Sequence, residues 1–328
     1  MNLTLKKFLI SITLIICLAA SFTACTSDSH TDTTENNTNV EYPTKERPTV
    51  NLDNADPYDG DLFFRAPSDI TYEKDGVDYG TIEVVQYPST TVGKDREVSI
   101  IFPPNYTTDK EYPVLYVFHG LGQDNTQWIN DGKVDKIIGN MLASGECEEM
   151  IIVAPNCRAR ENDAGNPADE YSDSNFGAFD NFYFEFLTDL KPFIESNYPV
   201  KTGRENTALA GFSRGGLISL RLGFGNQDMF GYIAAFNVPA DIDNYYIDLY
   251  DTDAYISYEH LVLAEEYKDN TYIAIAGGKN DDVVSGPAAY HSLLEESGIE
   301  HFYCQYAGGH SFSVADKGFY HFAKELFK

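Results

Sequence analysis

The sequence predicts an α/β fold, in which a mostly parallel sheet is covered by helices on both faces. Strand-like apolar runs alternate with helical patterns along most of the chain. These runs are continuously apolar, which is typical of strands buried on both sides in a parallel sheet. A chain of 328 residues with 43% hydrophobic residues can bury one substantial core. We therefore expect a single domain over residues 58–328.

The expected elements follow from the hydrophobic pattern. Strands are predicted at 81–87, 96–102, 114–119, 150–154, 207–210, 232–236, 272–276 and 301–306. Helices are predicted at 133–144, 179–196, 215–222, 258–267, 286–297 and 316–326. The first two strands form a plausible antiparallel start to the sheet.

The second predicted helix has one apolar face made largely of aromatic residues. Phe179, Phe182, Phe186 and Leu190 recur at three- and four-residue steps, which indicates core packing. The segment 169–179 before it is rich in Asp, Ser and Asn, and it is either a pocket-lining loop or a plain solvated connection.

The N-terminus has the pattern of a bacterial lipoprotein signal peptide. Two lysines precede an apolar stretch at 8–20, which is too short to span a membrane comfortably. It ends at a lipobox-like sequence in which Cys25 would be lipidated, so residues 1–24 are expected to be removed; plain signal cleavage nearby is the alternative. Residues 25–57 are polar and are expected to form a flexible tether. The protein is thus expected to be exported and lipid-anchored to the outer face of a bacterial membrane, or secreted.

Charge and cysteine content exclude several classes of function. With 51 acidic and 23 basic residues, the net charge is −28, which disfavours nucleic-acid binding. Cys147, Cys157 and Cys304 remain after processing and make no disulfide framework. No cysteine–histidine spacing indicates a zinc site, and no metal or cofactor is expected.

A G-x-S-x-G pentapeptide at 211–215 predicts a nucleophilic serine. It lies between the predicted strand 207–210 and the following helix, so Ser213 would occupy a sharp turn above the sheet edge. A serine hydroxyl needs a base to remove its proton during attack. In the α/β-hydrolase fold, the acid and then the histidine follow the serine along the chain, each after a later strand.

His310 and an aspartate complete this order. His310 follows the strand 301–306, and the two preceding glycines leave room to turn its ring toward the serine. The acid should follow the strand 272–276, where Asp281 and Asp282 stand side by side. Asp281 is favoured, and Asp282 remains the alternative.

The segment after the strand 114–118 is the expected oxyanion loop. Backbone N–H groups of Leu121 and Arg214 could hold the oxyanion of a tetrahedral intermediate. His119 is either a ligand contact or a hydrogen-bonding residue beneath the loop. Trp128, the only tryptophan, could stack on a sugar or a phenolic acyl group, or it could cap the core.

Four segments together resemble a known family. Residues 116–122 with the tryptophan that follows, 150–156, 208–216 and 308–312 are similar to the putative-esterase family, which includes the esterase D proteins and carbohydrate esterase family one. The resemblance covers about residues 79–327 and implies an α/β-hydrolase that cleaves carboxylic esters without a cofactor. Feruloyl and acetylxylan esterases, and siderophore esterases, are its nearest relatives by this resemblance. Many members carry Met or Leu where this chain has Arg214, a cation that could alter which acyl group is accepted.

Three hypotheses follow for the function. The first is an esterase that removes feruloyl or acetyl groups from plant cell-wall xylan, held at the membrane by its lipid anchor. The second is an esterase for siderophores or small acyl esters, although this acidic chain shows no basic lining for anionic siderophores. The third is a non-catalytic surface protein that binds carbohydrate. It is disfavoured because the serine, acid, histidine and oxyanion loop all occur in the required order.

Overall fold

The computed structural model describes residues 58–165, 170–240 and 261–328, all within one compact unit. The expected signal peptide, the lipidation of Cys25 and the tether at 25–57 lie outside these residues. Within the described part of the chain, every helix is too short or too polar to cross a membrane.

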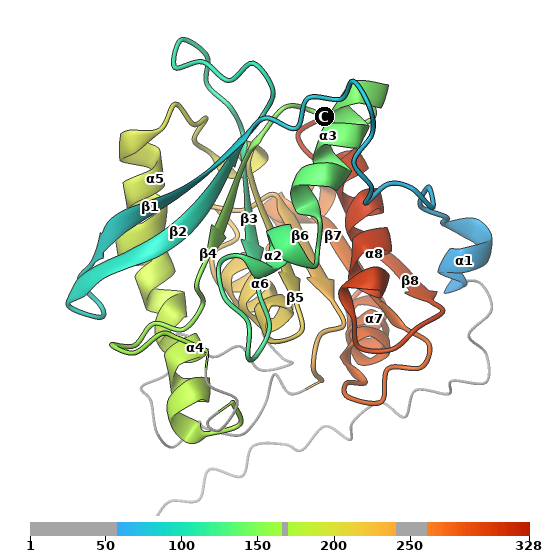
Figure 1. Cartoon of the computed structure of the whole chain (residues 1–328). Coiled ribbons are helices and arrows are strands. Elements are labelled where there is room, and N and C mark those ends of the chain that lie inside the picture. The colour runs from blue at the N-terminus through green and yellow to red at the C-terminus, as the bar shows by residue number, and fades with distance from the viewer. Residues whose placement is uncertain (1–57, 166–169, 241–260) are drawn as a thin grey trace, which may run out of the picture. The chain divides into compact units, whose positions relative to one another are not determined.

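One sheet of eight strands runs through the molecule in the order β1-β2-β4-β3-β5-β6-β7-β8 (Figure 1). β1 pairs antiparallel with β2, β2 pairs antiparallel with β4, and all other neighbours are parallel. This confirms the mostly parallel sheet with an antiparallel start. The strands are β1 Thr81–Ser89, β2 Lys94–Phe102, β3 Val114–Phe118, β4 Ile151–Pro155, β5 Thr207–Phe212, β6 Tyr232–Phe236, β7 Tyr272–Gly278 and β8 Phe302–Tyr306.

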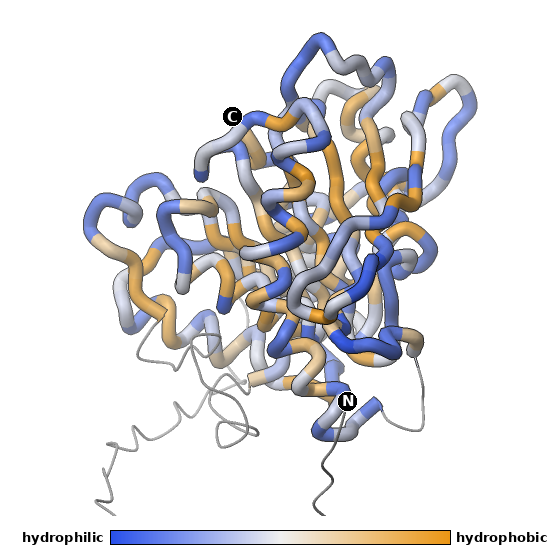
Figure 2. Tube along the Cα trace, turned by 90° about the vertical axis from the view of Figure 1, so that its left-hand side faces the viewer, coloured by the Kyte–Doolittle hydropathy of each residue, from blue (hydrophilic) through white to orange (hydrophobic). Residues whose placement is uncertain are grey.

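Helices cover both faces of the sheet and form a three-layer α/β/α structure (Figure 1). One core cluster joins α3 and α8 to the sheet, and two further clusters join α4, α5, α6 and α7 to the opposite face. Hydrophobic segments lie inside the molecule and hydrophilic ones occupy the connecting loops (Figure 2). The helices are α1 Gly60–Phe63, α2 Gln127–Asn130, α3 Val134–Ser144, α4 Asp173–Glu185, α5 Lys191–Asn197, α6 Arg214–Gly225, α7 Gly286–Glu296 and α8 Phe312–Glu325.

The long aromatic helix begins earlier than the apolar pattern predicted. The Ser172 side chain accepts a hydrogen bond from the Asn175 amide and caps α4, so much of the segment expected to be a loop is helical. A π-helical turn at Phe186–Leu190 joins α4 to α5 without a break. The prediction therefore found the buried face but missed the polar first turns, which carry no apolar signal.

The predicted helix at 258–267 is wrong in its described part. Residues 261–264 are not helical, and a short 3₁₀ helix occupies Glu265–Asn270. Leu261 and Leu263 are buried while Val262 is exposed, which is an extended alternation and not a helical period.

Candidate active site

Ser213 occupies the turn between β5 and α6, with φ of 55° and ψ of −124°. A positive φ is uncommon for a residue other than glycine and indicates a strained turn. A Cβ on Gly211 would lie 2.0 Å from the Gly215 carbonyl oxygen, and a Cβ on Gly215 would lie 2.2 Å from that of Phe118. Both flanking positions therefore require glycine. The Ser213 amide donates to the Phe236 carbonyl at 2.8 Å, which ties the turn to β6.

A continuous hydrogen-bonded chain links serine, histidine and aspartate. The distance from Ser213 Oγ to His310 Nε2 is 2.9 Å, and that from His310 Nδ1 to Asp281 Oδ2 is also 2.9 Å. Since a carboxylate only accepts, Nδ1 carries the ring proton and Nε2 is left to accept the serine O–H. Asp282 is exposed and makes no such bond. Of the two candidate acids, the geometry selects Asp281.

The Asp281 carboxylate is held by four donors. Oδ1 accepts from the amides of Val283 and Val284 at 3.0 Å each, and Oδ2 accepts from Asn237 Nδ2 at 2.7 Å as well as from His310. Burial by itself raises the pKa of Asp281, but the hydrogen bonds from Asn237, His310 and Val284 outweigh it, and the pKa is lowered. The acid is therefore ionised at neutral pH.

Sequence reasoning missed Asn237. It directly follows β6, so it lies at the same edge of the sheet as the residues that follow β5, β7 and β8. A polar residue after an apolar run at 232–236 is the signal that could have identified it, because the carboxyl ends of parallel strands meet at one edge.

The expected oxyanion loop lies against the serine. A Cβ on Gly120 would be 2.9 Å from the Ser213 Cβ, so glycine is required for this approach. The Gly120 amide donates to Gln123 Oε1 at 2.8 Å, whereas the Leu121 amide has no acceptor in the described part of the chain. Arg214 supplies the first amide of α6, beside Ser213. The two segments expected to donate to an oxyanion thus adjoin Ser213 from both sides.

The Arg214 side chain is turned toward α4. Its Nη2 donates to Asp180 Oδ1 at 3.0 Å, and its guanidinium lies over the Phe176 ring, 5.2 Å from the centroid. Arg221 donates to the same carboxylate oxygen at 2.6 Å. The Arg214 cation beside Ser213 is therefore partly neutralised by Asp180 and fixed in direction.

His119 is buried, and of the two alternatives for this residue the structure supports the hydrogen-bonding role beneath the loop over a substrate contact. Its Nε2 accepts from the Cys157 amide at 2.8 Å, so its Nδ1 carries the proton and donates to the Gly120 carbonyl at 2.7 Å. Burial, with the nearby Arg158 guanidinium, lowers the pKa of His119 to about 4 and keeps the ring neutral. The ring connects the oxyanion loop to the segment after β4.

Trp128 packs in the core and does not line a substrate surface. Only 1% of it is exposed, and its indole N–H donates to the Phe118 carbonyl at 2.8 Å. The ring packs against Phe236, Phe312 and Phe319, with centroids 5.2–6.3 Å apart. Of the two alternatives for this residue, the structure supports the core role.

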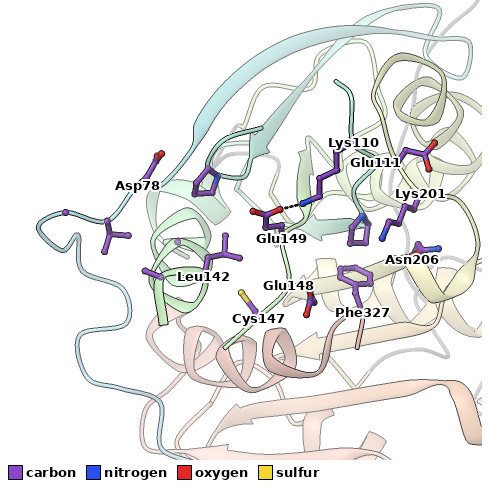
Figure 3. A pocket seen from close by; sticks show the side chains of 16 residues that line it. Asp78, Lys110, Glu111, Leu142, Cys147, Glu148, Glu149, Lys201, Asn206 and Phe327 are labelled. Carbon is purple, nitrogen blue, oxygen red and sulfur yellow. Dashed lines mark hydrogen bonds and ion pairs between the residues drawn. The ribbon is translucent and has the colours of Figure 1, made fainter. Parts of the chain in front are cut away.

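A pocket of about 500 Å³ lies at the opposite end of the parallel strands from the triad. It is formed by residues just before β3, β4 and β5, with Lys110 and Glu149 paired across it (Figure 3). The candidate active site lies at the carboxyl ends of the strands, where ligands of α/β sheets usually bind. This pocket lies at the other end and is separate from it. Among the described residues, no group of three or more His, Cys, Asp or Glu is arranged to hold a metal ion.

Comparisons with known proteins agree with this geometry. Residues 89–324 match the family model described as "Putative esterase". A CE1 ferulic acid esterase from Anaeromyces mucronatus, solved in complex with ferulic acid, is 31% identical with a TM-score of 0.70, and the match covers 80% of this chain and 96% of that one.

Two further proteins are similar over a smaller part of their length or at lower identity. An endo-1,4-beta-xylanase/feruloyl esterase from Xylanibacter ruminicola is 30% identical over an alignment of 168 residues, and the match covers 49% of this chain and 22% of that much longer protein. An enterobactin esterase from Shigella flexneri has a TM-score of 0.58 at 18% identity, covering 80% of this chain and 62% of that one, and shows the fold alone.

Proposed function

Since the chain belongs to the putative-esterase family and is a carboxylic-ester hydrolase of the α/β-hydrolase fold, we propose that it acts through an acyl-enzyme formed on Ser213. The observation that carries this proposal is the hydrogen-bonded chain from Ser213 through His310 to Asp281. A binding protein with no catalytic role would have no need for this arrangement.

Each residue has a defined role in the proposed reaction. Ser213 Oγ attacks the ester carbonyl while His310 Nε2 takes its proton, and Asp281 stabilises the resulting imidazolium. The amides of Leu121 and Arg214 donate to the oxyanion of the tetrahedral intermediate. The imidazolium then protonates the leaving alcohol. Water attacks the acyl-enzyme with His310 again as base, which releases the acid and restores the serine.

We further propose that the substrates are feruloyl or acetyl esters of xylan. Support comes from the 31% identical ferulic acid esterase and from the relative that combines xylanase and feruloyl esterase in one protein. The lipoprotein pattern ending at Cys25 also suits a polymer that cannot enter the cell. Export and lipid anchoring belong to the same proposal.

The test compares the chain from residue 26 onward with its Ser213→Ala variant on methyl ferulate, acetylated xylan and a small acetyl ester. We expect hydrolysis of the first or second substrate and a fall in kcat by a factor on the order of 10⁴ or more in the variant. Activity on the small ester alone would contradict the xylan substrate, and activity that survives in Ser213→Ala would contradict the mechanism. Asp281→Ala and Asp282→Ala form a matched pair, of which only the first should remove activity.

A further inference from the structure

Asn237 stands at the junction of the three loops that carry the triad. It follows β6 with φ of +47°, in the left-handed region that asparagine tolerates better than most residues. Its amide N–H donates to the Ala276 carbonyl at 2.9 Å, and the preceding carbonyl, of Phe236, accepts from Ser213. The backbone here thus connects the nucleophile turn to the strand that carries the acid.

The Asn237 side chain connects the acid to the base. Its Nδ2 donates to Asp281 Oδ2 at 2.7 Å and to the Gly309 carbonyl at 3.2 Å. Gly309 is the residue from which His310 follows, and His310 Nδ1 donates to the same Asp281 oxygen. One amide group therefore contacts both the carboxylate of the acid and the backbone that carries the base.

The chemistry of these partners fixes the orientation of the amide. A carboxylate and a carbonyl only accept, so the NH₂ end of Asn237 must face them. Its Oδ1 is then left buried without a hydrogen-bond partner among the described residues, in a side chain that is 0% exposed. Leaving a buried acceptor unsatisfied destabilises the folded state, and an apolar residue at this position would avoid that penalty. The favourable contribution of the Asn237 amide is its two donated hydrogen bonds, to Asp281 and to the Gly309 carbonyl.

We propose that Asn237 is a positioning residue of this site, which holds the Asp281 carboxylate and the Gly309 carbonyl together so that His310 keeps one orientation and one tautomer. The inference rests on the proposed function, because it gives Asn237 a part in the same mechanism. The Asn237 side chain donates to Asp281 and to the Gly309 carbonyl, so it acts through the acid and the backbone of the histidine loop.

Two substitutions separate this role from a structural one. Asn237→Gly and Asn237→Asp both suit a positive φ. Glycine removes both donors, whereas aspartate can keep one, because two carboxylates in contact share a proton. Misplacing a catalytic group by about 1 Å can cost on the order of 100-fold, so we expect the kcat of Asn237→Gly to fall about 10- to 100-fold, with KM little changed. The kcat of Asn237→Asp should fall less while its carboxyl holds that proton, and should approach that of Asn237→Gly at a pH where both carboxylates are ionised.

Asn226→Asp is the matched control. The Asn226 amide also donates twice, to the Tyr183 hydroxyl and the Leu222 carbonyl at 3.0 Å each, but it lies away from the triad. This variant should change the unfolding temperature and leave the pH profile as in the parent chain. If Asn237→Gly keeps the parental kcat, or loses activity only in proportion to its unfolded fraction, the proposal is overturned.

The second measurement is the rate at which a fluorophosphonate labels Ser213, which needs the triad and not a natural ester. If the parent chain hydrolyses none of the three esters but is labelled, the proposed substrates are wrong, and slower labelling of Asn237→Gly would still support this inference. If Asn237→Gly is labelled at the parental rate, the inference alone fails. A folded parent chain that is neither active nor labelled would overturn both proposals.

Discussion

Replacing Trp128 by phenylalanine should destabilise the fold and leave substrate affinity nearly unchanged. The substitution removes the indole N–H that donates to the Phe118 carbonyl and leaves that acceptor buried, at a cost of about 1–3 kcal/mol. It also truncates a ring that packs against Phe236, Phe312 and Phe319, where complete removal of a buried Trp costs about 3–5 kcal/mol and partial removal costs less. Together we expect a loss of about 2–4 kcal/mol in the free energy of unfolding.

Urea unfolding followed by far-UV circular dichroism measures this loss, because the variant has no tryptophan left to report by fluorescence. Steady-state kinetics on methyl ferulate gives KM, which should stay within about twofold of the parent value. A variant of unchanged stability whose KM rises more than about tenfold would refute the core assignment and restore a substrate contact.

The remaining predictions concern Gly211 and Asp316. Gly211→Ala should abolish ester hydrolysis, because the added Cβ would lie 2.0 Å from the Gly215 carbonyl; kinetics on the folded variant tests this, and near-parental kcat would contradict it. Burial raises the pKa of Asp316 to about 8, so the folded state keeps a proton that the unfolded chain releases above about pH 4, and stability must decline over that interval. Asp316→Asn should therefore unfold at a higher temperature than the parent, with a difference that grows from pH 4 to pH 8. An equal difference at pH 5 and pH 8.5 would count against the buried, protonated carboxyl.

The hydrogen-bonded arrangement of Ser213, His310 and Asp281 could be predicted because these residues follow a simple topological rule. Ser213 and His310 each follow a predicted strand, and parallel strands bring their carboxyl ends to one edge. This rule could not separate Asp281 from Asp282, because both residues lie in the loop that follows the same strand. Only the loop conformation, in which two backbone amides turn onto Asp281, distinguishes them.

Other residues depend on side-chain direction, which a pattern of apolar residues does not contain. His119 and Trp128 both lie near the nucleophile in the chain's topology, yet both side chains turn inward and bond to backbone groups. Asn237 was missed because a single polar residue after a strand looks like ordinary loop sequence. The helix predicted at 258–267 failed because Leu261, Val262 and Leu263 are all apolar, so their sequence does not show that the valine alone faces solvent.

The four strands that carry Ser213, Asn237, Asp281 and His310 are consecutive neighbours, β5 to β8, at one side of the sheet. About a hundred residues of chain separate the serine from the histidine, so their 2.9 Å contact exists only when every strand between them is paired in register. Enzyme activity during refolding is consequently a sensitive reporter of assembly in the C-terminal half of the protein. β1, at the far edge, carries none of these four residues. A fusion partner inserted into the hairpin between β1 and β2 should therefore affect catalysis least.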